Sequence, residues 1–470
     1  RLTGSSAFVG DYFLSPKGDK FYYVASATEG GSNLLVRDTK KGDTKVLLKG
    51  VSGGMAADKK GENLFVISSK GVQKINLAKG DIENVEFEAE YDRKPSLERE
   101  YIFDHMLRQV NDKFYDADLH GVDWEYYGNH YREFLPYIDN NRDFAILLSE
   151  ILGELNASHT GASAPAGWAQ LSTADLGAFF DETYKGDGLK IAEILPRSPL
   201  ASKKAGMSVG DIILSIDGKK IEAGKEYYSL LEGKAGRKVR LEVKKADGKT
   251  AFATVKPLSY GQVHNMLYQR WVDRNQAMVD SLSEGRIAYV HVEGMNSPSY
   301  RTVYDELLGK YRNREAVIVD TRFNGGGWLH NDLAILLSGK EYVRFTPRGR
   351  YIGSEPFSQW TKPSVMLVNE GNYSDAHGSP YTYQTLGIGD VVGAPVPGTM
   401  TAVWWENQID PEIRFGIPQV TSSDMNGKPL ENNQLNPDVL IYNDPADELR
   451  GRDAQIEGAV KHLLRKLDNK

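Results

Sequence analysis

The chain has 470 residues, which predicts roughly two to four domains at about 150 residues each. Hydrophobic residues at 40% and charged residues at 26% are ordinary globular values, and the interspersed net charge of −7 argues against nucleic acid or an anionic membrane as the main partner. No run of about 18 apolar residues predicts a membrane span. The absence of cysteine excludes disulfides, thiolate metal sites and a cysteine nucleophile. Because the first residue is Arg1 and no secretory leader precedes it, we expect a fragment or a processed chain.

Residues 1–92 read as short strands separated by turns. Strands are expected at 21–25, 33–37, 44–48 and 63–67. Turns with a Lys-Gly pair, at 17–21 and 60–64, recur about 43 residues apart, a spacing typical of a four-stranded propeller blade. Two blades cannot close a ring, so we expect the end of a truncated β-propeller, with a small independent sheet as the alternative.

The period becomes helical over residues 93–168. Apolar side chains fall on one face of each of two expected helices: Tyr101, Phe103, Met106, Val110 and Phe114 on the first, and Phe144, Leu147, Leu148, Ile151 and Leu152 on the second. This helical domain ends in a loop of small residues, GELNASHTG, that contains Ser158 and His159.

Residues 169–258 form an expected module of their own. In order come Leu176–Phe180, a strand at 189–194, the segment Ser-Pro-Leu-Ala at 198–201 and the segment 209–218. This order resembles a PDZ domain of the permuted kind found in bacterial proteases. The resemblance implies that Leu176, Gly177, Ala178 and Phe179 offer backbone N–H groups to a peptide carboxylate while an edge strand accepts the peptide. A spacer that binds nothing is the alternative.

Residues 259–470 alternate strand and helix. Strands are expected at 287–292, 316–320 and 365–369, with helices near 299–312 and 330–338. This alternation predicts an α/β layered domain whose site lies where the strands end.

Two segments at such strand ends carry candidate chemistry. Ser374 and Asp375 follow the strand at 365–369, at the expected start of a helix, where the dipole favours negative charge. The other interpretation is that they only cap this helix. The glycine run 325–327 follows the strand at 316–320, and bare backbone N–H groups of this kind can face an oxyanion. The N–H of Asp375 is the natural first donor, and that of Gly326 or Gly327 the second.

Besides the candidate serine and the oxyanion donors, the sequence offers a candidate general base and a candidate carboxylate. His159 stands among small neighbours that leave its ring accessible, while His330 and His377 are rivals because they lie near the site segments. Glu431, in LENNQLNPD, offers the carboxylate. A serine needs a base to take its proton and a third group to orient that base. Neither HxH nor HExxH spacing occurs, so we expect no metal, and no cofactor is called for.

The segments GELNASHTG, DTRFNGGG, VNEGNYSDAHG and LENNQLNPD, with the PDZ-like module between them, resemble the tricorn protease family over residues 90–470. The resemblance implies a serine peptidase with a Ser–His–Ser–Glu tetrad. It places the nucleophile on Ser374, the base on His159, the base-orienting hydroxyl on Ser158 and the carboxylate on Glu431, with Gly327 and Asp375 as oxyanion donors.

The resemblance also implies an α/β catalytic domain like those of tail proteases and crotonases, short peptides as substrates, and a homo-oligomer built from dimers into hexamers. It implies the cytoplasm, and the periplasm stays open as the alternative.

Two departures from the family pattern stand out. The chain has Ala376 and His377 where the family usually has Gly-Asp. It also has Arg344 and Arg348, and no Asp, where the family archetype selects basic residues, so neutral or acidic residues are expected at the cleavage site.

Two other functions remain open. A carboxy-terminal processing protease shares the PDZ module and the α/β core but uses a Ser–Lys pair, and no lysine occurs here between Ser374 and Lys428. A catalytically silent peptide-binding scaffold is the other. The presence of all four tetrad residue types favours the enzyme.

Overall fold

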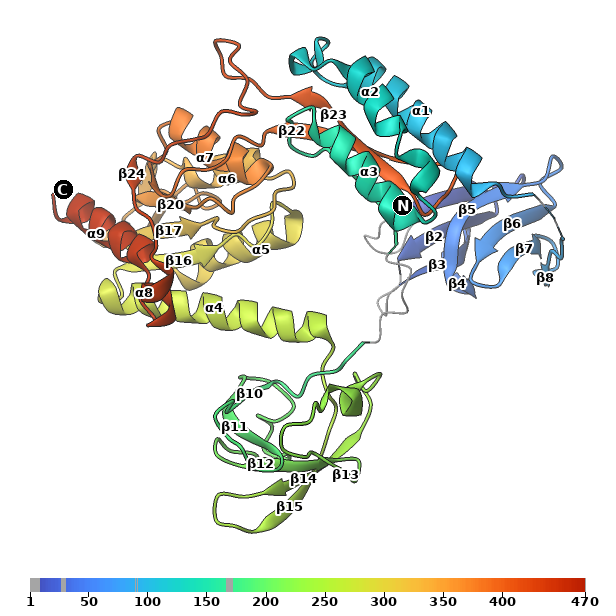
Figure 1. Ribbon diagram of the computed structural model, residues 1–470. Helices are drawn as coiled ribbons and strands as arrows, with labels where there is room; N and C mark the ends of the chain where they lie inside the picture. Colours follow the sequence, from blue (N-terminus) through green and yellow to red (C-terminus); the bar gives the residue numbers. More distant parts are fainter. Residues whose placement is uncertain (1–8, 27–30, 89, 91, 166–171, 470) are drawn as a thin grey trace. The chain divides into compact units, whose positions relative to one another are not determined.

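The computed structural model describes residues 9–26, 31–88, 90, 92–165 and 172–469. The chain divides into two compact units, Arg1–Lys94 and Pro95–Lys470 (Figure 1).

The first unit contains two four-stranded antiparallel sheets, each with its strands in chain order. Their strands are β1 (Val9–Leu14), β2 (Lys20–Ser26), β3 (Ser32–Asp38) and β4 (Thr44–Lys49), then β5 (Val51–Ala57), β6 (Asn63–Ser68), β7 (Gly71–Asn76) and β8 (Ile82–Asn84). Leu34, Leu64 and Ile75 are fully buried in the core that the two sheets share. The four expected strands are β2, β3, β4 and β6. The sequence missed the other four, since strands such as the exposed three-residue β8 carry little apolar pattern.

The second unit begins with a helical layer of α1 (Pro95–Lys113), α2 (Trp124–Arg132) and α3 (Asn141–Gly153). Its core holds the apolar residues predicted for the two helices except Tyr101, which is 49% exposed, and it also needs Phe415 and Ile417 from a strand far along the chain. That strand, β23 (Arg414–Thr421), lies between β22 (Thr401–Asn407) and the short β9 (Gly161–Ser163). This pairing fixes the segment that starts at Thr401 beside the loop containing Ser158.

The PDZ-like module has β10 (Ala178–Phe180), β11 (Leu189–Ile194), β12 (Ile212–Ile216), β13 (Lys219–Lys220), β14 (Val239–Lys244) and β15 (Thr250–Val255). Its main sheet has the order β10-β11-β12-β14-β15, so β10 is an edge strand. The domain boundary expected at 168–169 lies outside the described residues.

The α/β domain is built on a parallel five-stranded sheet of order β16-β17-β20-β21-β24. Its strands are β16 (Ile287–His291), β17 (Ala316–Asp320), β20 (Ser364–Val368), β21 (Asp390–Gly393) and β24 (Val439–Leu440). The first three are buried along their whole length, as expected for a sheet covered on both faces.

Helices cover both faces of this sheet (Figure 1). One face is covered by α4 (Tyr260–Leu282) and α9 (Ala454–Asp468), the other by α5 (Ser297–Asp305), α6 (His330–Leu337) and α7 (Asp375–Thr385). The remaining elements are the pair β18 (Val343–Phe345) and β19 (Gly353–Glu355), the helix α8 (Pro445–Leu449), a π-helical turn at Glu306–Lys310, and 3-10 turns at Leu119–Gly121, Leu135–Tyr137, Tyr228–Leu231 and Pro347–Gly349. The predicted layered domain and its helices near 299–312 and 330–338 are confirmed.

A buried charge cluster lies where β17 ends. The Arg322 guanidinium donates to Asp320 at 2.8 Å and to Asp453 at 2.8 Å, and Arg322 and Asp320 are 1% and 0% exposed. Asp320 also accepts from the Tyr289 hydroxyl at 2.8 Å. The cluster joins the start of α9 to the segment that leads into the glycine run.

We expect Arg322→Ala to lower the free energy of unfolding by about 3–5 kcal/mol, because it leaves the buried Asp320 carboxylate without its counter-charge. Urea titration of the purified protein measures the change. Arg344→Ala is the matched control, since its ion pair with Glu341 is largely exposed on the arginine side, and it should change stability by less than about 1 kcal/mol. Equal effects of the two substitutions would contradict the role given to the cluster.

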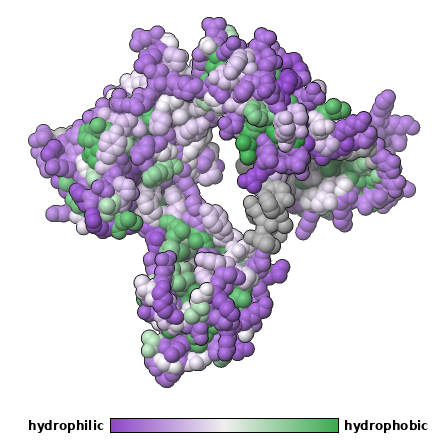
Figure 2. All heavy atoms as spheres, in the orientation of Figure 1, coloured by the Kyte–Doolittle hydropathy of each residue, from purple (hydrophilic) through white to green (hydrophobic). Residues whose placement is uncertain are grey.

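The face of the molecule seen in Figure 2 is mostly hydrophilic, with apolar residues in small separate patches. Among the described residues, no helix has the length and apolarity needed to cross a membrane.

Candidate active site

Ser374 stands on a strained turn between β20 and α7. Its backbone has φ 59° and ψ −126°, a conformation that non-glycine residues rarely adopt. A sharp strand-to-helix turn of this type presents a serine Oγ at the top of the sheet. Ser374 occupies the N-cap position of α7, yet its side chain makes no capping hydrogen bond. The interpretation of Ser374 as a helix cap is therefore wrong, and its hydroxyl is left available.

Two residues hold the backbone of this turn. The N–H of Ser374 donates to Thr399 Oγ1 at 2.9 Å, and the N–H of Thr399 donates to His377 Nδ1 at 3.3 Å. Burial lowers the pKa of His377 to about 4, so its ring is a neutral acceptor. His377 thus supports the serine turn from behind, and Ala376 beside it is fully buried in the core. Ala376 and His377, which depart from the family pattern, are therefore compatible with the turn at Ser374.

The glycine run lies directly against the serine. A Cβ on Gly326 would stand 2.4 Å from Ser374 Cβ and 3.0 Å from its Oγ, so only glycine fits there. The Gly326 N–H is occupied, because it donates to Asn324 Oδ1 at 2.8 Å. Within the described residues, the N–H groups of Gly327 and Asp375 have no hydrogen-bond partner. Gly327 and Asp375 are therefore free to act as oxyanion donors, and Gly326 acts by its lack of a side chain.

Asparagine side chains tie the two loops to each other. Asn369 Oδ1 accepts the N–H of Phe323 at 3.1 Å, and Asn372 Nδ2 donates to Thr321 Oγ1 at 3.0 Å. Asn369 and Asn372 are both buried. The polar residues around the serine and around the glycines therefore act as cross-links that hold both loops in register.

A hydrogen-bond chain runs from His159 to Glu431. Glu431 is 3% exposed, and its carboxylate accepts the Ser158 N–H at 2.6 Å and the Ser158 Oγ–H at 2.9 Å. Since the single hydroxyl proton of Ser158 goes to Glu431, Ser158 Oγ must accept from His159 Nδ1, 2.8 Å away. This order fixes the proton on Nδ1 and leaves Nε2 with a free lone pair.

Thr401 is a further member of this network. Its Oγ1 lies 2.9 Å from His159 Nδ1 and 2.9 Å from Ser158 Oγ, and it donates to the Ser158 carbonyl at 3.2 Å. With its proton used in this way, the Thr401 hydroxyl also accepts from Nδ1. Sequence reasoning missed Thr401 and Thr399, because only the pairing of β22 with β23 and the packing of β23 on the helical layer bring this segment to the site.

Burial shifts the pKa values of His159 and Glu431, the two ends of this hydrogen-bond chain, in opposite directions. It lowers the pKa of His159, which keeps the imidazole neutral near pH 7, and it raises the pKa of Glu431. Hydrogen bonds from Ser158 act against the shift at Glu431. A neutral imidazole is the form that accepts a proton from a hydroxyl.

Tyr373 brings the histidine and serine segments into contact. Its hydroxyl accepts the His159 N–H at 2.8 Å, and the two rings have centroids 4.7 Å apart. Among the described atoms there is no hydrogen bond between Ser374 Oγ and the His159 ring. Such bonds are often long in an unliganded site and shorten when substrate is present.

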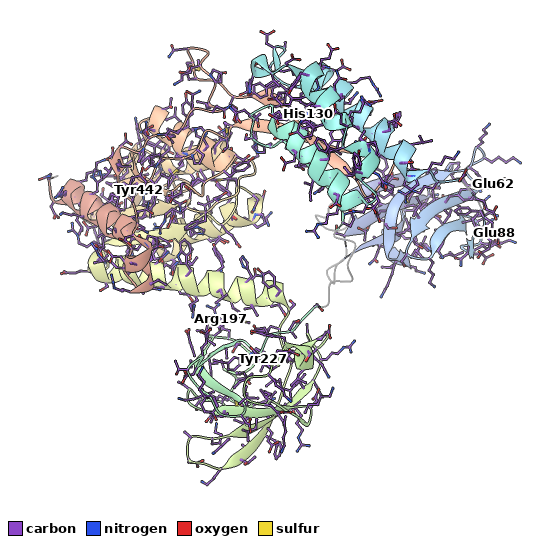
Figure 3. All side chains as sticks on the ribbon, viewed as in Figure 1. Glu62, Glu88, His130, Arg197, Tyr227 and Tyr442 are labelled. Atoms are coloured by element: carbon purple, nitrogen blue, oxygen red, sulfur yellow. The ribbon has the colours of Figure 1, made fainter. Side chains whose placement is uncertain are left out.

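The other histidines near the site have separate partners. His330 Nδ1 lies 2.5 Å from Asp375 Oδ1, and His377 supports Thr399, so neither rival is arranged as the base. Figure 3 labels His130 on α2, where its ring packs against Tyr126 and Phe134. Within the described part of the chain, no group of three or more His, Asp or Glu side chains is arranged to hold a metal ion.

The expected peptide-binding segment of the PDZ-like module divides into two parts. Leu176 is buried, and the Gly177 N–H donates to Asp175 Oδ1 at 2.6 Å. Ala178 and Phe179 belong to the edge strand β10, and Phe179 is 43% exposed. β10 thus lies at the edge of its sheet, whereas the Gly177 N–H is already used.

Three family models match consecutive parts of the chain. They are the tricorn protease C1 domain over residues 95–153, the tricorn protease PDZ domain over 181–260 and peptidase family S41 over 286–441.

Individual proteins agree with these matches. Tricorn protease homolog 1 of Streptomyces coelicolor is 29% identical over 80% of this chain and 36% of its own length, and tricorn protease of Thermoplasma volcanium is 24% identical over 78% and 36%. The chain thus spans about a third of these relatives. The crystal structure of the tricorn protease superposes with a TM-score of 0.83 at 21% identity, over 98% of this chain and 47% of that one, and shares its fold. In the order of its matched domains and in its fold, the chain resembles the tricorn proteases, and its residues 286–441 match peptidase family S41.

Proposed function

We propose that this protein is a serine peptidase that cleaves peptides through an acyl-enzyme, with Ser374, His159, Ser158 and Glu431 as its tetrad. The observation that carries the proposal is the chain of contacts from His159 Nδ1 to Ser158 Oγ at 2.8 Å and from Ser158 Oγ to Glu431 at 2.9 Å. With the Ser158 proton donated to Glu431, Nδ1 carries the ring proton and Nε2 is the base. The match of residues 286–441 to peptidase family S41 supports the same reaction.

The proposed reaction has two halves. Ser374 Oγ attacks the scissile carbonyl while His159 Nε2 takes its proton, and the oxyanion accepts hydrogen bonds from the N–H groups of Gly327 and Asp375. His159 then protonates the leaving amine, and the acyl-enzyme forms. In the second half, His159 activates a water that releases the acyl group. Ser158 and Glu431 keep the tautomer of His159 and stabilise its cation.

Substrate and assembly follow from the family and are part of the proposal. We infer short peptides as substrates, a homo-oligomer of dimers assembled into hexamers, and a propeller to which the strands of residues 9–84 belong. In the segment expected to select the cleaved residue, Arg344 is exposed and pairs with Glu341 at 2.8 Å. We therefore expect neutral or acidic side chains to be preferred there over basic ones. The edge strand β10 is the inferred docking position for a peptide.

A fluorophosphonate probe tests the proposal. The probe reacts with serines activated by a base, so we expect one adduct on the intact protein, mapped by peptide mass spectrometry to Ser374. Ser374→Ala should abolish the adduct, and Ser358→Ala, an exposed serine of the same domain, should retain it. A folded protein that stays unlabelled at Ser374 and fails to cleave a peptide library would favour the silent peptide-binding scaffold instead.

A further inference from the structure

The carboxylate of Asp375, next in sequence to Ser374, holds the C-terminal end of the loop between β17 and α6. This loop, residues 321–329, contains Gly327 and is called the oxyanion loop below. Asp375 Oδ2 accepts the N–H of Leu329 at 2.5 Å and that of His330 at 3.0 Å, and Oδ1 lies 2.5 Å from His330 Nδ1. Asp375 is the first residue of α7, but the helix it caps is α6, which begins at His330. These three contacts therefore join the nucleophile helix to the loop that contains Gly327.

This arrangement links both proposed oxyanion donors to one ion pair. The N–H of Asp375 is one donor, and Gly327 stands two residues before Leu329, whose N–H Asp375 holds. Asp375 is 2% exposed, and the other two groups on its carboxylate are uncharged N–H groups, so the His330 ring is its nearby cation when protonated. A buried carboxylate that loses its counter-charge is costly, and the N–H groups of Leu329 and His330 are the contacts through which that cost reaches the loop.

We propose that His330 is a positioning residue which, as the imidazolium, pins the Asp375 carboxylate and thereby sets the oxyanion loop against Ser374. The inference rests on the proposed function and extends it. His330 does not touch the reacting atoms; it acts through Asp375.

The charges that face His330 give the direction of the pH dependence. Asp375 on α7 and Asp332 on its own helix α6 both stabilise the imidazolium, and together they raise the pKa of His330 despite its partial burial. Tyr300 of α5, the other helix packed on α6, lies near Asp332 and is neutral below its raised pKa. Because the pKa is raised, the ion pair is complete at acid pH and is lost as pH rises through that pKa. Activity limited by the loop should therefore fall on the alkaline side, while protonation of His159 limits it on the acid side.

The test is the pH profile of kcat/KM on a chromogenic peptide for the parent, His330→Asn and His330→Ala. We expect a bell-shaped profile for the parent. The Asn side chain donates to Asp375 without titrating, so His330→Asn should keep activity and lose the alkaline limb. His330→Ala should lower kcat by about 10-fold or more at every pH with KM nearly unchanged, part of the 10²–10³-fold effect of one oxyanion donor. His264→Asn, an exposed histidine of α4, is the control and should keep the parent profile.

An alkaline limb that persists in His330→Asn, or a parent-like kcat in His330→Ala, would overturn the inference. Both results leave fluorophosphonate labelling of Ser374 intact, so they are distinct from failure of the proposed function. NMR titration of the histidine ring protons, with His330→Asn to assign the signal, gives a readout independent of activity. We expect His330 to titrate above the ordinary value of about 6.5, and a value below it would refute the ion pair.

Discussion

Ser374→Ala is expected to lower kcat by about 10⁴–10⁶-fold on any peptide that the parent cleaves, because it removes the hydroxyl on which the proposed acyl-enzyme forms. KM should change little, since the hydroxyl contributes to the transition state far more than to substrate binding. The remaining activity over water would come from the oxyanion donors and from substrate binding.

The free energy of unfolding of Ser374→Ala distinguishes the loss of kcat from damage to the fold. The Ser374 side chain makes no capping bond, and the N–H that Thr399 holds is still present in alanine. The free energy of unfolding of Ser374→Ala should therefore stay within about 0.5 kcal/mol of the parent. Ser358→Ala provides the control for activity. Cleavage by Ser374→Ala at more than about a hundredth of the parent rate would mean that another residue is the nucleophile.

The sequence predicted those parts of the site that depend on local pattern. Ser374 and the glycines 325–327 stand at the ends of buried apolar strands, and a parallel sheet brings such ends to one edge. Ser158 and His159 form one short segment with small neighbours, so their accessibility could be read locally as well. The PDZ-like module was likewise predicted, from the resemblance of its motif order, and a PDZ family model matches residues 181–260.

The remaining parts depend on contacts between distant segments. Thr401 and His159 stand 242 residues apart, and they meet only because β23 completes the core of the helical layer. The capping of α6 by Asp375 crosses from one loop to another, and a capping residue in the sequence is ordinarily assigned to its own helix. Arg322 is buried between Asp320 and Asp453, and Asp453 stands far from it in the sequence. Hydrophobic periodicity and motif spacing do not predict contacts between segments so far apart in the sequence.

The second large effect is expected at His159, the proposed general base. His159→Ala should lower kcat by about 10⁴–10⁶-fold, because Ser374 then has no acceptor for its proton. The rate of fluorophosphonate labelling should fall in parallel, since it depends on the same proton transfer. The cost to stability should be modest, about 0.5–1.5 kcal/mol for the ring contact with Tyr373. His264→Ala should retain the parent values.

The double variant Ser374→Ala with His159→Ala decides whether the two residues act as one unit. Groups that transfer one proton in one step have non-additive effects, so the double variant should be no slower than Ser374→Ala alone. Additive losses would mean that His159 does something besides accept the serine proton. In the proposed network Ser158 and Thr401 accept the Nδ1 proton and Glu431 accepts that of Ser158, so Nε2 is the ring atom that can accept the proton of Ser374.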